Sequence, residues 1–279
     1  MTVSVISVLA GTATAAGSSH WRPGVFWPTL FSAMCIHLGT NLINDYFDYI
    51  NGVDTHEERY REHVLPAGLL TPRQVGAAAV AAFLIAILFG LPLIKVGGWP
   101  ILTVGLASIA TGVLYTGGPW PLGYNGLGDI LTFVFFGLVA VSGTFYLHAD
   151  GLTLLPVLVA VPIGSLVTAI LAANNTRDAH IDRQVGKRTL AVMLSPDFTR
   201  KEYIALVTGA YLMIPLIVAL YPAAAGIFLS WLTLPLGFSL VKGMLAPHPR
   251  RETCDRTLAG TFMLHWQFGL LVTIGLLIG

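Results

Sequence analysis

The chain has 279 residues, of which 55% are hydrophobic and only 10% are charged. Soluble domains carry about 25% charged residues, so this composition excludes an ordinary soluble fold and indicates a polytopic membrane protein whose partner is the lipid bilayer. The net charge of +1 gives no sign of a nucleic-acid partner, and two cysteines are too few for a disulfide framework.

Nine apolar segments, bounded by glycine, proline or charged residues, predict an all-α fold of nine transmembrane helices in a single bundle. They cover residues 2–17, 25–49, 73–94, 98–116, 127–147, 152–174, 203–220, 223–242 and 258–278. We expect residues 1–279 to form one domain. The first segment is shorter than the roughly 20 residues of a spanning helix, so we also expect a natural N-terminal piece to be missing.

The loops alternate between short ones and long charged ones. The long loops, at 50–73, 175–202 and 242–257, hold all but Arg22 and Lys95 of the 15 lysines and arginines. Basic residues stay on the cytoplasmic side of a membrane. The sequence therefore predicts a cell-membrane protein with its N-terminus and its ionisable chemistry in the cytoplasm and its C-terminus outside. Chemistry gathered on one face favours an enzyme over a channel.

The second apolar segment ends in NLINDYFDYINGVD, residues 41–54. Asn41, Asp45 and Asp48 are spaced i, i+4, i+7, which places them on one face of a helix, and Asn44 flanks that face. Carboxylates so close repel each other unless a cation lies between them. The alternative is a solvated helix end with a few acids.

The sixth apolar segment ends in a similar way, in AANNTRDAHIDRQVGKRTLAV, residues 172–192. Asn174, Asp178 and Asp182 are spaced i, i+4, i+8 and again share one helix face. Three basic residues follow at once: Arg183, Lys187 and Arg188. The chain thus carries two apolar helices that become rich in Asn and Asp at the same side of the membrane.

Carboxylates without histidine or cysteine suit Mg²⁺, which keeps one or two protein carboxylates and completes its shell with water and phosphate oxygens. The neighbouring lysine and arginines would bind phosphate directly. The apolar interior would hold a hydrocarbon chain. These features predict an amphiphilic ligand with a diphosphate head and a lipid tail. An ion-coupled secondary transporter, whose buried acids bind protons or sodium, is the alternative from another class.

NDYFDYINGVD and NNTRDAHIDRQVGKRTLAV, with YTGGPWPLGYNGLGD between them, resemble motifs of the UbiA superfamily of intramembrane prenyltransferases. The resemblance is greatest to the branch that prenylates 1,4-dihydroxy-2-naphthoate in menaquinone synthesis. The chain departs from the general first motif because Gly52 stands at its last acidic position and the next acid is Asp54. Many relatives also have an arginine where this chain has His63, so Arg59 or Arg61 is expected to replace it.

The resemblance implies nine helices and Mg²⁺-dependent transfer of a polyprenyl group from prenyl diphosphate to an aromatic acceptor. The implied acceptor is 1,4-dihydroxy-2-naphthoate, with loss of carbon dioxide; 4-hydroxybenzoate, homogentisate or another acceptor stays open. The implied Mg²⁺ ligands, which are also the catalytic residues, are Asp45, Asp48, Asp178 and Asp182. The implied residues for the diphosphate are Arg183, Lys187 and Arg188. The other implied substrate-binding residues are Arg177 for the carboxylate of the acceptor, Tyr115 and Tyr146 for the carbocation, and Asn41, Asn44 and Asn174.

Overall fold

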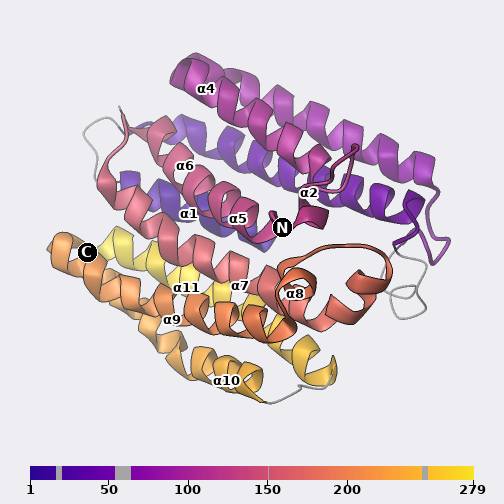
Figure 1. The fold of residues 1–279 in the computed structure, drawn as a ribbon. Coiled ribbons are helices and arrows are strands. Elements are labelled where there is room, and N and C mark those ends of the chain that lie inside the picture. The colour runs from indigo at the N-terminus through magenta and orange to yellow at the C-terminus, as the bar shows by residue number, and fades with distance from the viewer. Residues whose placement is uncertain (17–20, 54–63, 150, 247–250) are drawn as a thin grey trace.

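The computed structural model describes residues 1–16, 21–53, 64–149, 151–246 and 251–279, and every regular element in this range is a helix (Figure 1). The α-helices in chain order are α1 (Thr2–Ala15), α2 (Phe26–Ile50), α4 (Pro72–Leu114), α5 (Gly128–Thr132), α6 (Ala140–His148), α7 (Leu154–Gln184), α8 (Leu190–Met193), α9 (Pro196–Leu220), α10 (Leu234–Leu245) and α11 (Arg251–Ile278). The π-helix η4 (Phe133–Val139) joins α5 to α6, and the 3-10 helix η5 (Pro222–Thr233) leads into α10. Two short 3-10 helices are η1 (Pro23–Val25) and η3 (Gly123–Asn125).

Helix α4 is interrupted at the place where the sequence predicts a loop between two apolar helices. Gly98 has φ 65° and ψ −153°, which is not helical. Side chains disfavour a positive φ, so glycine is the residue that permits this break. Counted as continuous rods, the long helices of the described residues form the nine helices predicted. In this count α4 gives two rods, α5, η4 and α6 together give one, and η5 and α10 together give one.

The outer surface of the bundle is apolar, as the composition predicts. In the described residues, six helical stretches are long and apolar enough to cross a membrane: Pro72–Leu114, Gly128–His148, Leu154–Gln184, Pro196–Leu220, Pro222–Leu245 and Arg251–Ile278. Large side chains point outward from them, including Leu88 (64% exposed) and Phe238 (73%). Exposed apolar surface on this scale marks contact with lipid, and the chain is an integral membrane protein.

Three predicted helix boundaries were wrong, because hydropathy detects only the apolar part of a helix. Helix α7 continues to Gln184, beyond the predicted end at residue 174, and α11 already begins at Arg251. Helix α9 begins at Pro196, where the Ser195 side chain accepts a hydrogen bond from the Phe198 backbone at 3.1 Å. A serine cap followed by proline at the first helical position is a start signal that the sequence carries.

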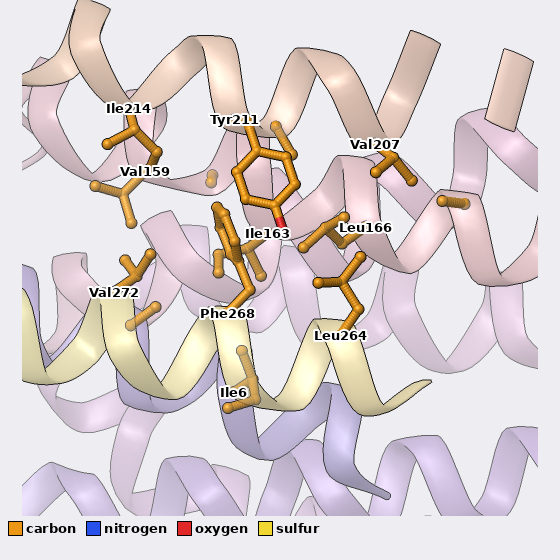
Figure 2. Close-up of a cluster of buried hydrophobic side chains, with 14 of the residues drawn as sticks. Ile6, Val159, Ile163, Leu166, Val207, Tyr211, Ile214, Leu264, Phe268 and Val272 are labelled. Atoms are coloured by element: carbon orange, nitrogen blue, oxygen red, sulfur yellow. The ribbon is translucent and has the colours of Figure 1, made fainter. Parts of the chain in front are cut away.

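Helix α7 is the centre of the bundle. It packs against α1 and α6 on one side and against α9 and α11 on the other (Figure 1). Figure 2 shows Ile163 and Leu166 of α7 among side chains from α9 and α11, where the rings of Tyr211 and Phe268 meet edge to face at 5.4 Å. The second aspartate motif therefore lies on the most firmly packed helix.

Helix η4 approaches α7 through two glycines, and this contact gives a prediction about stability. A Cβ atom on Gly137 would lie 2.7 Å from the Cα of Gly164 and 3.1 Å from the Ala160 carbonyl oxygen, both backbone atoms that cannot rotate away. We expect Gly137→Ala to destabilise the protein by about 1–3 kcal/mol. The measurement is the melting temperature in detergent.

Gly143→Ala is the matched control, because a Cβ there meets no atom within 4 Å and alanine favours a helix. Its melting temperature should equal or exceed that of the wild type. Equal melting temperatures for Gly137→Ala and the wild type would contradict the close approach of η4 and α7.

Candidate active site

A cavity of about 300 Å³ lies where α2, α4 and α7 end and α5 begins. Asp48 from α2 and Asp178 and Asp182 from α7 all line it. Two stretches of chain that are more than a hundred residues apart therefore bring their carboxylates to one space. The same cavity is lined by Tyr115, the residue that follows α4.

Asp48 connects α2 to both loops that border the cavity. Its carboxylate accepts a hydrogen bond from the Tyr124 hydroxyl and forms an ion pair with Lys187 at 2.8 Å. The Lys187 ammonium also lies 4.9 Å from the centre of the Tyr124 ring, within range of a cation–π contact. A cation of the chain thus already lies at one of the predicted metal ligands.

The two loops are also joined through their backbones. The Arg188 amide donates to the Tyr124 carbonyl at 2.9 Å, and the Lys187 amide donates to the Asp182 carbonyl at 2.8 Å. Gly186 has φ 78°, which lets the chain turn sharply after α7. This turn brings the Lys187 side chain back over the end of the helix that it follows.

The second motif is built on one face of α7, as its spacing predicts. Asn174, Asp178 and Asp182 all line the cavity, and both aspartates are buried. The Arg177 guanidinium donates two hydrogen bonds of 2.8 Å to the Asp178 carboxylate. It also donates hydrogen bonds to Asn174 at 3.0 Å and to Asp255 at 3.2 Å. Arg177 lines the cavity as predicted, but its own chain supplies partners for much of its guanidinium.

Of the polar residues of the first motif that the structure describes, only Asp48 is in the cavity lining. Asn44 accepts a hydrogen bond from Thr116, a cavity residue, at 2.9 Å. Asp45 and Asn41 are not in the lining; Asp45 is partly exposed and Asn41 is exposed. Asp48 is therefore the residue of this motif that lines the cavity, and Asn44 contacts the lining through Thr116.

Three further predicted residues lie outside the cavity. The side chains of Arg183 and Arg188 are exposed and do not line it. Tyr146 donates to the Gly97 carbonyl at 3.2 Å, beside the break in α4. It lies 17 residues along a nearly continuous helix from Asp129, or roughly 25 Å at 1.5 Å per residue. The structure thus does not place Tyr146 in the cavity lining, and its role at the carbocation stays a prediction. Asp54, Arg59, Arg61 and His63 lie outside the described residues.

Tyr124 and Asp129 are polar cavity residues that were not among the predicted site residues. Asp129 is only 4% exposed, and its Oδ1 atom has no hydrogen-bond partner among the described residues. Both residues belong to the YTGGPWPLGYNGLGD stretch, which served only to support the resemblance. Asp129 stands directly before a long apolar run in the sequence, and this position could have indicated it as a site residue.

Tyr115 is held against the start of α5. A Cβ atom on Gly128 would lie 2.6 Å from the Tyr115 hydroxyl, so glycine is needed at that position. Burial, together with the negative charges of Asp129, Asp48 and Asp182, raises the pKa of Tyr115. The hydroxyl therefore keeps its proton at neutral pH and can donate a hydrogen bond into the site.

The donor set suits Mg²⁺ that is shared with a phosphate group. In the described part of the chain, no three acidic, histidine or cysteine residues lie close enough to hold an ion by themselves. Asp48, Asp178 and Asp182 supply oxygen atoms only, which Mg²⁺ prefers, and this ion usually takes one or two carboxylates and leaves the other positions to water and phosphate. The residues present therefore fit this ion when a diphosphate accompanies it.

Comparison with known proteins assigns the chain to one family. The chain belongs to the UbiA prenyltransferase family, whose model matches residues 4–275. It is 38% identical to the 1,4-dihydroxy-2-naphthoate octaprenyltransferase of Mycobacterium leprae, over 87% of this chain and 83% of that protein. It is 31% identical to the Bacillus subtilis protein of the same name, over 100% of this chain and 89% of that one.

A solved structure shares the fold at low sequence identity. The UbiA homolog from Archaeoglobus fulgidus bound to GPP and Mg²⁺ superposes with a TM-score of 0.64 at 12% identity, covering 98% of this chain and 96% of that one. Family membership makes the protein a prenyltransferase and decides against the transporter that the sequence left open.

Proposed function

We propose that this protein transfers a polyprenyl group from a prenyl diphosphate to 1,4-dihydroxy-2-naphthoate. The observation that carries the proposal is the cavity in which Asp48 meets Asp178 and Asp182, bordered by Lys187 and Arg177. The acceptor follows from relatives of 31% and 38% identity that are named for this substrate. The shared fold with the Archaeoglobus fulgidus homolog, whose structure holds GPP and Mg²⁺, supports a prenyl diphosphate as the donor substrate.

The aspartates would hold Mg²⁺ at the diphosphate. Asp48, Asp178 and Asp182 supply the oxygen atoms from the lining, and Asp45 stays a predicted ligand on the neighbouring edge of α2. When bound, the ion offsets the charge that builds up on the departing diphosphate. Lys187 adds a positive charge at the same place, and Arg183 and Arg188 stay predicted contacts of the outer phosphate.

The reaction joins the first carbon of the prenyl chain to the ring carbon that carries the carboxylate. The allylic C–O bond breaks and its electron pair leaves with the diphosphate. The ring carbon then forms the new C–C bond, and the electrons of the bond to the carboxylate return to the ring as carbon dioxide departs. The aromatic faces of Tyr115 and Tyr124 would stabilise the allylic cation, by about 2 kcal/mol when water is excluded.

Arg177→Lys tests which partner the guanidinium serves. An arginine binds a carboxylate with two parallel hydrogen bonds, and lysine cannot reproduce that geometry. We expect the KM for the naphthoate to rise about tenfold, which corresponds to about 1.4 kcal/mol, and the KM for the prenyl diphosphate to change less than about threefold.

Arg256→Lys is the control for this substitution, because Arg256 is exposed on α11 and lies outside the cavity lining. It should leave both KM values unchanged. A rise confined to the KM of the prenyl diphosphate would instead show that Arg177 positions Asp178, to which it donates two hydrogen bonds in this structure.

We further propose that all nine rods cross the bilayer, with the cavity on the cytoplasmic side, the N-terminus inside and the C-terminus outside. The distribution of lysine and arginine between the loops supports this orientation. Accessibility of cysteines introduced at Gly186 and Gly151 to a reagent that cannot cross the membrane will check it. Labelling of intact cells at position 151 but not at position 186 is the expected result.

Product analysis by mass spectrometry tests the proposed function directly. The purified protein receives several prenyl diphosphates of different length, with 1,4-dihydroxy-2-naphthoate or 4-hydroxybenzoate as the acceptor and Mg²⁺ in the buffer. A prenylated naphthalenediol that has lost the mass of carbon dioxide is the expected product. Prenylated hydroxybenzoate as the main product would reassign the acceptor.

A further inference from the structure

Asp129 is the one buried acid in the cavity lining that neither aspartate motif contains. It lies in the first turn of α5, and only 4% of its surface is exposed. Its Oδ1 atom has no hydrogen-bond partner, and no ion pair found among the described residues includes it. By contrast, Asp48 and Asp178 are both paired with cations of the chain.

A buried carboxylate oxygen without a hydrogen-bond partner is costly. A buried acceptor without a donor destabilises the folded protein, and more so when it is charged. Ionisable side chains at membrane depth are retained mainly for function. The cost disappears when a ligand supplies the missing donor. Because Asp129 lines the cavity, such a ligand has a place to bind.

The chemistry of the missing partner follows from what a carboxylate can bind. The Oδ1 atom of Asp129 can accept a hydrogen bond, and neither a prenyl chain nor a fully ionised diphosphate offers a donor. The ring hydroxyls of a hydroxylated aromatic acceptor are such donors, and a phenol bound to a carboxylate makes a short, charge-assisted hydrogen bond. Tyr115, whose hydroxyl lies against Gly128 beside Asp129, supplies an aromatic surface at the same wall.

We propose that Asp129 is a specificity-determining residue that binds a ring hydroxyl of the aromatic acceptor. The inference rests on the proposed function, because it takes the acceptor to be a dihydroxylated ring. It divides the cavity into a wall for the diphosphate, formed by the two motifs, and a wall for the acceptor at the start of α5. An acceptor without a hydroxyl at that wall would leave the carboxylate unsatisfied and would be rejected.

Asp129→Asn tests this role, because the amide keeps the size of the side chain but loses its charge and one acceptor atom. The Kd of 1,4-dihydroxy-2-naphthoate, measured by calorimetry on the purified protein, and its KM are expected to rise roughly 10- to 100-fold. The KM of the prenyl diphosphate should change less than about twofold. The melting temperature should be unchanged or higher, since an unpaired buried charge is removed.

Two ligand analogues and one control variant sharpen the test. The analogues are 1-hydroxy-2-naphthoate and 4-hydroxy-2-naphthoate, each of which lacks one ring hydroxyl. The analogue without the contacted hydroxyl should bind to Asp129→Asn at least as tightly as to the wild type, since the variant no longer carries the charge that rejects it. Ser142→Ala is the control, because the Ser142 hydroxyl is also buried and without a partner in the described part of the chain but lies outside the cavity lining. Its Kd should equal that of the wild type.

The outcomes separate this inference from the proposed function. A wild-type protein that prenylates the naphthoate, with an Asp129→Asn variant of unchanged acceptor Kd, would overturn the role of Asp129 alone. So would a rise in the KM of the prenyl diphosphate without a rise in that of the acceptor. A wild-type protein that gives no prenylated naphthoate with any donor would overturn the proposed function itself.

Discussion

Asp48→Asn is expected to lower turnover by about 10³-fold or more, while the folded protein stays intact. The substitution keeps the shape of the side chain but removes a negative charge from the wall that would hold the diphosphate and its metal ion. A thousandfold loss corresponds to about 4 kcal/mol of transition-state stabilisation, a reasonable share for one ligand of a metal-bound leaving group. The measurement is steady-state product formation with saturating substrates and Mg²⁺.

Asp197→Asn provides the control for charge removal near the same end of the bundle. Asp197 pairs with Arg200 on the surface of α9, and its side chain is 69% exposed. Surface ion pairs contribute little, so turnover should stay within about twofold of the wild type. Asp178→Asn should repeat the loss seen for Asp48→Asn, because it affects the other motif. Turnover near the wild-type rate in both motif variants would remove the site from this cavity.

Removal of divalent metal ions is expected to abolish turnover without unfolding the protein. With EDTA in excess, product formation should fall to the background rate, and added Mg²⁺ should restore it. Ca²⁺ should restore far less, since it is larger and takes six to eight ligands in a looser geometry. Full activity in EDTA would contradict a role for the metal.

The ion pairs of the cavity determine how the melting temperature should respond to metal removal. Without a metal ion, Asp48 is already paired with Lys187 and Asp178 with Arg177, so the carboxylates are not left to repel each other. The melting temperature in EDTA should therefore match that in Mg²⁺ to within about two degrees. Prenyl diphosphate added with Mg²⁺ should raise the melting temperature, because a ligand that binds only the folded state stabilises it. A large loss of stability in EDTA alone would show that the ion is needed for folding instead.

Apolar segments and helix spacing predicted the parts of the fold that depend on regular geometry. The break was visible because Lys95, Gly97 and Gly98 separate two apolar runs, and Gly98 is the residue at which the helix is interrupted. The face of α7 was visible because Asn174, Asp178 and Asp182 repeat close to the helical period, and all three meet the cavity. Such features are local and need no knowledge of neighbouring helices.

The orientation of α2 could not be obtained in the same way. Asn41, Asn44, Asp45 and Asp48 cover a broad arc of the helix, and period alone does not say which edge of the arc faces inward. Packing decides this, through contacts such as that of Thr116 with Asn44. The closure of the cavity by Tyr124 and Lys187 depends on the path of two loops, and irregular segments have no period from which their contacts can be read.

The backbone hydrogen bond between Arg188 and Tyr124 has a consequence for how the sequence can diverge. It uses only the amide of one residue and the carbonyl of the other, so any side chain at either position preserves it, apart from a proline at 188, which has no N–H group. Descendants of this chain can therefore exchange the side chains at both positions while the two loops remain joined to each other.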